Sequence, residues 1–150
     1  MSGLAALRHP LFSDVVMEHF CRPRNVGKLS SLHGEGWAGT PARGMSMRIQ
    51  IQLADGHIAN ARFATFGCVP AIASGSLLTE WVKGRTLEEA EAFSARDLIE
   101  ALDGLPSERR FCAEWAVDAL RAALADATQR SQHSDESDAP PHQREAGGTP

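Results

Sequence analysis

The sequence predicts an α+β fold in which a small antiparallel sheet of about three strands packs against about four to five helices. Residues 45–53 alternate apolar and polar side chains, which is the period-two pattern of a strand with one solvated face. The Asp55-Gly56 dipeptide that follows is a strong hairpin signal, so residues 58–66 are expected to return antiparallel. Apolar residues then recur at helical spacing as far as Ala127, which predicts a helical second half ending in a long helix.

The N-terminal part is expected to supply one more helix and one more strand. Residues 11–20 carry apolar side chains at the spacing of a short amphipathic helix, with Ser13 as its N-cap. Residues 34–44 are rich in glycine and are expected to form an edge strand or a loop. Because the hairpin reverses the chain, the turn around Arg43 and the turn around Cys68 are expected at the same end of the sheet.

Local signals divide the second half into separate helices. Residues 71–82 are expected to be helical, and their small side chains indicate close packing on the sheet. Thr86 begins a capping-box pattern and Ser94 is a candidate N-cap for the next helix. The last helix is expected over residues 107–127. From Gln129 the chain is almost free of apolar residues, which predicts a folded domain over 1–128 and a disordered polar tail over 129–150.

Composition limits the class of protein. A chain of 150 residues with 43% hydrophobic residues suffices for one domain, and the net charge of −4 without a basic stripe argues against nucleic acid as the main partner. No apolar run approaches the roughly 20 residues that span a bilayer, and the N-terminus has no signal-peptide core. Three widely spaced cysteines without a CxxC pair are typical of free thiols in a reducing compartment. A soluble, cytoplasmic protein is therefore expected.

Cys68 is the residue with the strongest local case for chemistry. Gly67, a residue free to take positive φ, is expected to end the preceding strand, and Pro70 suits the first turn of a helix. A cysteine just before a helix N-terminus is favoured as a thiolate, the form needed for metal binding or sulfur transfer. A buried, inert cysteine is the alternative that the local pattern leaves open. Cys112, in the first turns of the last helix, has the same local chemistry, whereas Cys21 at a helix C-terminus does not.

Four segments of the chain together carry a family resemblance. They are EHFCRPRNVGKL (18–29), TPARGM (40–45), FGCVPAIASGSLLTEWVKG (66–84) and LPSERRFCAEWAVDAL (105–120). In these segments the chain resembles the iron-sulfur cluster assembly scaffolds, of the IscU type and of the NifU amino-terminal-domain type, over residues 11–127. The resemblance implies binding of iron or a [2Fe-2S] cluster, with zinc as an alternative.

The resemblance also implies where a metal would be bound. Members of this family use three cysteines, assisted by an aspartate and a histidine. Two of the cysteines match Cys68 and Cys112. The third cysteine position holds Arg43, the aspartate position Met45 and the histidine position Phe111. The guanidinium of Arg43 repels a divalent ion but attracts thiolates, so we expect it either to swing into solvent when metal binds or to act as the counter-charge in the metal's place.

Three functions of different classes follow from this resemblance and from the two cysteines that match it. The first is a variant scaffold in which two protomers each give Cys68 and Cys112 to one bridging cluster. The second is a paralogue that binds no cluster and docks the cysteine desulfurase or another scaffold. The third is a relay in which Cys68 or Cys112 accepts persulfide sulfur.

The expected partners also come from the family resemblance. They are a cysteine desulfurase and recipient apo-proteins, together with a second copy of the chain if a homodimer forms. The family's Leu-Pro-Pro-Val-Lys segment for an Hsp70-type chaperone reads Leu105-Pro-Ser-Glu-Arg109 here, which weakens the case for that partner. No nucleophile with a paired base is evident, so the protein is not expected to be an enzyme.

Overall fold

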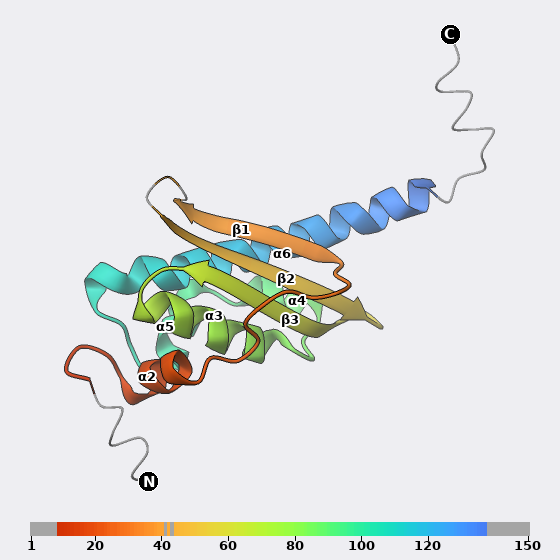
Figure 1. The fold of residues 1–150 in the computed structure, drawn as a ribbon. Helices are drawn as coiled ribbons and strands as arrows, with labels where there is room; N and C mark the ends of the chain where they lie inside the picture. Colours follow the sequence, from red (N-terminus) through yellow and green to blue (C-terminus); the bar gives the residue numbers. More distant parts are fainter. Residues whose placement is uncertain (1–8, 41, 43, 138–150) are drawn as a thin grey trace.

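Three strands form an antiparallel sheet in the order β1-β2-β3 (Figure 1). The computed structural model describes residues 9–40, 42 and 44–137. The strands are β1 (Gly34–Thr40), β2 (Met45–Ala54) and β3 (His57–Phe66). The glycine-rich segment is thus an edge strand, one of the two alternatives expected for it.

The hairpin between β2 and β3 has the predicted turn. Asp55 and Gly56 both have positive φ, 54° and 76°, as a two-residue turn of type I′ requires. At the other end of the strands, Thr40 pairs with Met45 and Ser46 pairs with Phe66. The turn that follows β1 and the turn that follows β3 therefore lie at the same end of the sheet, as expected. Arg43 itself lies outside the described residues.

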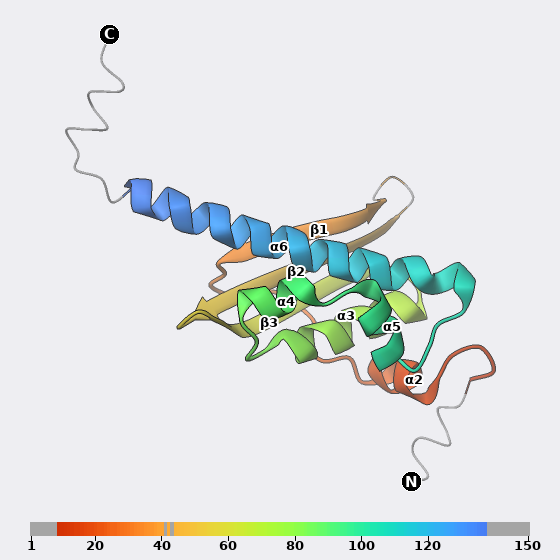
Figure 2. The same ribbon diagram turned by 180° about the vertical axis from the view of Figure 1, so that it is seen from behind.

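Helices cover one face of the sheet, as the view from behind shows (Figure 2). Helix α6 packs on β1 and β2, α3 packs on β3, and α2 packs against α3. The helical elements are α2 (Asp14–Cys21), α3 (Val69–Val82), α4 (Leu87–Ala92), α5 (Ala95–Ala101), the short 3-10 helix η2 (Ser107–Arg109) and α6 (Arg110–Ser137). The predicted α+β fold is confirmed.

The predicted caps are present. The side chain of Ser13 accepts a hydrogen bond from the backbone of α2. Thr86 with Glu89, and Ser94 with Asp97, form two complete capping boxes at the starts of α4 and α5. These caps explain why two short helices begin where they do, although neither is longer than two turns.

Close approach of helices to the sheet depends on small residues. A Cβ placed on Gly36 would lie 2.1 Å from the carbonyl oxygen of Ala119, so α6 rests directly on the backbone of β1. A Cβ on Gly75 would lie 2.4 Å from the ring of Phe63, which confirms the predicted close packing of α3 on the sheet. The core between the layers includes these fully buried side chains: Val16, Met47, Ile49, Ile51, Ile58, Phe63, Leu78, Val82, Leu98, Leu102, Val117 and Leu120.

Helix α6 is longer than predicted. It continues to Ser137, whereas the sequence predicted its end near Ala127 and a disordered tail from Gln129. An ion pair of 2.8 Å between Arg130 and Asp126, one turn apart, supports the extra turns. Residues 138–150 lie outside the described part. Within that part, no helix has the combination of length and apolarity that crossing a bilayer requires.

Candidate functional site

Cys68 is the N-cap residue of α3. Strand β3 ends at Phe66, and Pro70 lies in the first turn of the helix as expected. Gly67 does not have the positive φ that the sequence suggested. Glycine is required there for a different reason, since a Cβ would lie 2.8 Å from the Cβ of Ala71 in the turn that follows. The tight turn from strand to helix places Cys68, half-buried, at the rim of the sheet, that is, at the end where β3 stops.

Cys112 reaches the same rim from another element. It is the third residue of α6 and is fully buried. Its sulfur lies 3.5 Å from the sulfur of Cys68. The starts of α3 and α6 therefore bring two thiols that are 44 residues apart in sequence into hydrogen-bonding contact.

The two sulfurs are close enough to share one proton. The hydrogen bond between the two sulfurs, in which either thiol can be the donor, lowers the pKa of Cys68 to about 6 although burial opposes it. The backbone amide of Ala71 and the positive charge of Arg109 lower that pKa further. The same hydrogen bond, together with burial, raises the pKa of Cys112. The expectation that both cysteines are favoured as thiolates is therefore wrong for Cys112, because ionising the second sulfur would place two negative charges side by side.

The spacing of the pair suits a thiophilic ion. Two sulfurs bound at about 2.3 Å to a tetrahedral zinc or iron ion are about 3.8 Å apart, so 3.5 Å is within a few tenths of an ångström of that geometry. Binding would release the shared proton. Among the residues whose side chains the structure describes, no group of three Cys, His, Asp or Glu side chains could hold a metal. The pair therefore offers two ligands of the four that such an ion prefers.

Two of the three substituted ligand positions, 45 and 111, hold apolar residues and lie together. Met45 and Phe111, with Thr40 and Trp115, line a cavity of about 210 Å³. The rings of Phe111 and Trp115 meet edge to face with centroids 4.9 Å apart. Sequence reasoning did not include Thr40 or Trp115, although the spacing of Phe111 and Trp115 by four residues in a helix was a usable signal. Arg43 cannot be placed, because it lies outside the described residues.

The remaining candidate residues have structural roles or none. Cys21 is exposed on α2. His19 is buried and its Nδ1 lies 2.7 Å from the hydroxyl of Ser76. The Nδ1 of His33 accepts a hydrogen bond from the backbone N–H of Leu53. Both histidines are thus hydrogen-bonded, and neither joins the cysteine pair.

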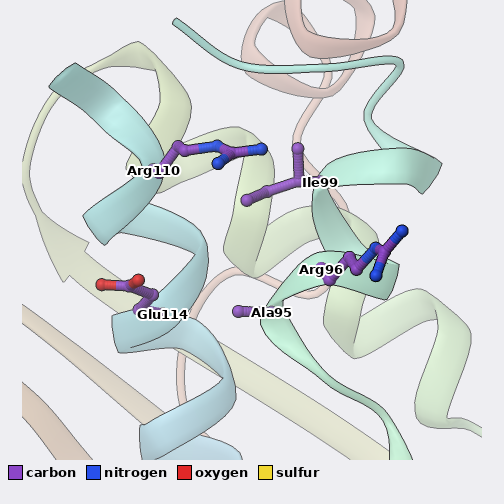
Figure 3. A pocket seen from close by; sticks show the side chains of 5 residues that line it. All are labelled: Ala95, Arg96, Ile99, Arg110 and Glu114. Atoms are coloured by element: carbon purple, nitrogen blue, oxygen red, sulfur yellow. The ribbon is translucent and has the colours of Figure 1, made fainter. Parts of the chain in front are cut away.

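A larger cavity, of about 450 Å³, lies between α5 and α6 (Figure 3). The side chain of Arg110 extends across it toward Ile99, whereas that of Glu114 points away. Its lining residues are Ala95, Arg96, Ile99, Arg110 and Glu114. This cavity contains none of the predicted site residues and no thiol or imidazole, so it adds no ligand to the cysteine pair.

The fold and the site define a class of protein: a small α+β domain with two thiols held together at one end of its sheet. The family model of the NifU-like N-terminal domain matches residues 11–134. The chain belongs to this family.

Curated relatives support the assignment. The iron-sulfur cluster assembly scaffold protein IscU of Azotobacter vinelandii is 48% identical over 119 residues, which covers 77% of this chain and 92% of the relative. The IscU of Escherichia coli strain K12 is 46% identical over the same shares. IscU 1 of Archaeoglobus fulgidus is 45% identical over 116 residues, covering 77% of this chain and 76% of the relative.

Solved structures show the same fold. The N-terminal part of a nitrogen-fixing NifU-like protein from Brucella abortus superposes with a TM-score of 0.63 at 17% identity, over 78% of this chain and 94% of that one. A putative scaffold protein for the SUF system from Fervidobacterium islandicum superposes with a TM-score of 0.62 at 20% identity, over 75% and 96%.

Proposed function

We propose that this protein acts in iron-sulfur cluster assembly as a scaffold, not as an enzyme, with Cys68 and Cys112 as its ligands for iron or a [2Fe-2S] cluster. The observation that carries the proposal is the 3.5 Å distance between the two sulfurs, which is close to the distance between two thiolate ligands of one tetrahedral metal ion. Membership of the family and the names of its relatives supply the process.

Ligand number determines the expected assembly. A [2Fe-2S] cluster held by thiolates takes four of them, and one chain supplies two at this rim. We propose that two protomers share one cluster, each giving Cys68 and Cys112. A cysteine desulfurase would supply the sulfur and apo-proteins would receive the cluster. The pair must be reduced for ligation, which suits a reducing compartment such as the cytoplasm.

Anaerobic reconstitution with ferrous iron and sulfide tests this proposal. Visible absorption, iron per chain and molecular mass are measured on the same sample. We expect one cluster per two chains, its loss in Cys68→Ser and in Cys112→Ser, and no change in the matched control Cys21→Ser, since Cys21 is exposed on a different helix. No cluster in the wild type, with a cluster gained in Arg43→Cys, would reject the proposal and favour a docking module that binds no cluster.

A second function, persulfide relay, is favoured by the difference between the two cysteines. Cys68 is half-buried and its pKa is lowered to about 6, so it is an accessible thiolate near neutral pH, whereas Cys112 is fully buried. Incubation with a cysteine desulfurase and its substrate, followed by mass spectrometry, tests the relay. Absence of a sulfur adduct on either cysteine rejects it.

A further inference from the structure

We propose that the Cys68–Cys112 pair is itself a reductant, which takes a sulfane sulfur delivered to Cys68 and releases it as sulfide, leaving a Cys68–Cys112 disulfide. This activity rests on the proposed sulfur-handling role of the pair, and it deepens that role by naming the residue that completes the reaction. The structure supports it through accessibility, distance and direction of attack.

Accessibility decides which cysteine receives the sulfur. Cys112 has no exposed surface, whereas Cys68 is half-buried at the start of α3. Of the two sulfurs of the pair, a persulfide donor, whether a small molecule or a side chain of another protein, can therefore reach only that of Cys68. Its terminal sulfur passes to the thiolate of Cys68, and the donor leaves as a thiol.

Distance decides what happens next. The sulfur of Cys112 lies 3.5 Å from that of Cys68, which is at the upper end of the 3–3.5 Å range of a near-attack geometry. Each sulfur is carried on a single rotatable side-chain bond at the start of a different helix. Closing this gap to the roughly 2.05 Å of a disulfide is therefore a side-chain movement of about 1.5 Å.

The direction of attack follows from burial. Cys112 is fully buried whereas Cys68 is partly exposed, so the sulfur of Cys112 approaches from the inner side and a sulfur delivered from solvent arrives on the outer side. Displacement at a disulfide-type bond requires the attacking, attacked and leaving sulfurs to be roughly in line, and delivery of the added sulfur from the solvent side favours that arrangement. The leaving sulfide departs directly into solvent.

The reaction balances without another oxidant or reductant. The sulfur of Cys112 attacks the sulfur of Cys68, the bond from Cys68 to the added sulfur breaks, and that sulfur leaves with the electron pair as hydrosulfide. The proton of the Cys112 thiol passes to solvent or to the leaving group. Over the two steps together, each cysteine sulfur loses one electron and the sulfane sulfur gains two electrons. An external dithiol must reduce the disulfide before the pair can act again.

Glutathione persulfide, added anaerobically to the reduced full-length protein, tests this proposal. Released sulfide is measured per chain, and intact mass distinguishes a chain that has gained a sulfur atom from one that has lost two hydrogen atoms. For the wild type and the control Cys21→Ser we expect one sulfide per chain and the disulfide. Cys112→Ser and Cys112→Ala are expected to keep the extra sulfur on Cys68 and to release sulfide at least about tenfold more slowly, at the background rate set by glutathione.

Two results would overturn the proposal: a wild type that accumulates persulfide on Cys68 without a disulfide, or Cys112 variants that release sulfide as fast as the wild type. The wild-type result decides the question even if a Cys112 variant does not fold. Reconstitution with inorganic sulfide bypasses the reduction step, so it tests the ligand role alone. Sulfide release without cluster formation would reject the scaffold proposal and support the reductant proposal. Cluster formation without sulfide release would reject the reductant proposal and support the scaffold proposal.

Discussion

Replacing Cys112 by alanine is expected to raise the pKa of Cys68. In the wild type that pKa is about 6, and the hydrogen bond from Cys112 is the largest of the contributions that lower it. Alanine cannot donate this bond, while the Ala71 amide and the charge of Arg109 remain in place. The pKa of Cys68 in Cys112→Ala therefore lies between about 6 and the ordinary value of 9.0.

The largest effect on the reactivity of Cys68 is expected if its pKa in Cys112→Ala rises fully to 9.0. At pH 7 a thiol of pKa about 6 is roughly nine-tenths thiolate, and one of pKa 9.0 is about one-hundredth thiolate. A thiolate whose thiol has the higher pKa is also the stronger nucleophile. For a pKa difference of about three and a Brønsted coefficient near 0.45, its rate constant is about 20-fold larger. Alkylation at pH 7 then slows by only about fourfold, whereas at about pH 10 the variant reacts about 20-fold faster. The two rate profiles therefore cross.

Alkylation by iodoacetamide between about pH 4 and about pH 10 measures this directly, with Cys21→Ser as the background so that exposed Cys21 does not react. The wild-type rate of Cys68 is expected to rise with an inflection near pH 6. Arg109→Gln should move the inflection upward by less than Cys112→Ala does, because the charge of Arg109 is a smaller contribution. An inflection that stays in place when Cys112 is removed would refute the shared-proton arrangement.

Three further predictions concern stability, each measured as the free energy of unfolding by denaturant titration. Gly36→Ala is expected to cost at least about 3 kcal/mol, because its Cβ would meet the Ala119 carbonyl at 2.1 Å. Ser94→Ala should cost about 1 kcal/mol by removing the N-cap of α5. The backbone N–H of Ser94 and, to a smaller extent, its hydroxyl lower the pKa of Asp97, and the substitution removes only the hydroxyl, so a part of this cost should disappear as the pH falls below 3.8. Burial lowers the pKa of His19 below 6.5, so stability should decrease as the pH falls through 6.5, and His19→Gln should lack this slope.

The fold was predictable because its signals are local. The alternation over residues 45–53, the Asp55-Gly56 turn and the capping boxes each specify backbone geometry within a few residues. The end of α6 was missed because polar composition alone predicted disorder. Pairing of Asp126 with Arg130 one turn later, and the absence of glycine and proline from residues 107–137, were the signals that the helix continues.

Both cysteines could be selected from the sequence, and the structure places their sulfurs together, but the interaction between the sulfurs could not be predicted. Cys68 and Cys112 could be chosen from their positions before and within helix starts. That one of them keeps its proton depends on a 3.5 Å distance between side chains 44 residues apart, which no local pattern contains. The role of Gly67 was misread for a similar reason, since the constraint is a contact with Ala71 and not a backbone angle.

The substitutions around the pair depend on one another. Met45 and Phe111 stand where the resemblance implies an aspartate and a histidine, and they line one cavity with Trp115. A carboxylate introduced alone at position 45 would lie against aromatic rings without a partner, which costs free energy. An imidazole introduced alone at position 111 would lose part of the edge-to-face contact with Trp115. Either substitution by itself therefore replaces apolar packing with an unpaired polar group. The metal-binding chemistry at this end of the sheet thus depends on the two thiols, and a further Cys, His, Asp or Glu ligand has to come from outside the described residues or from a second chain.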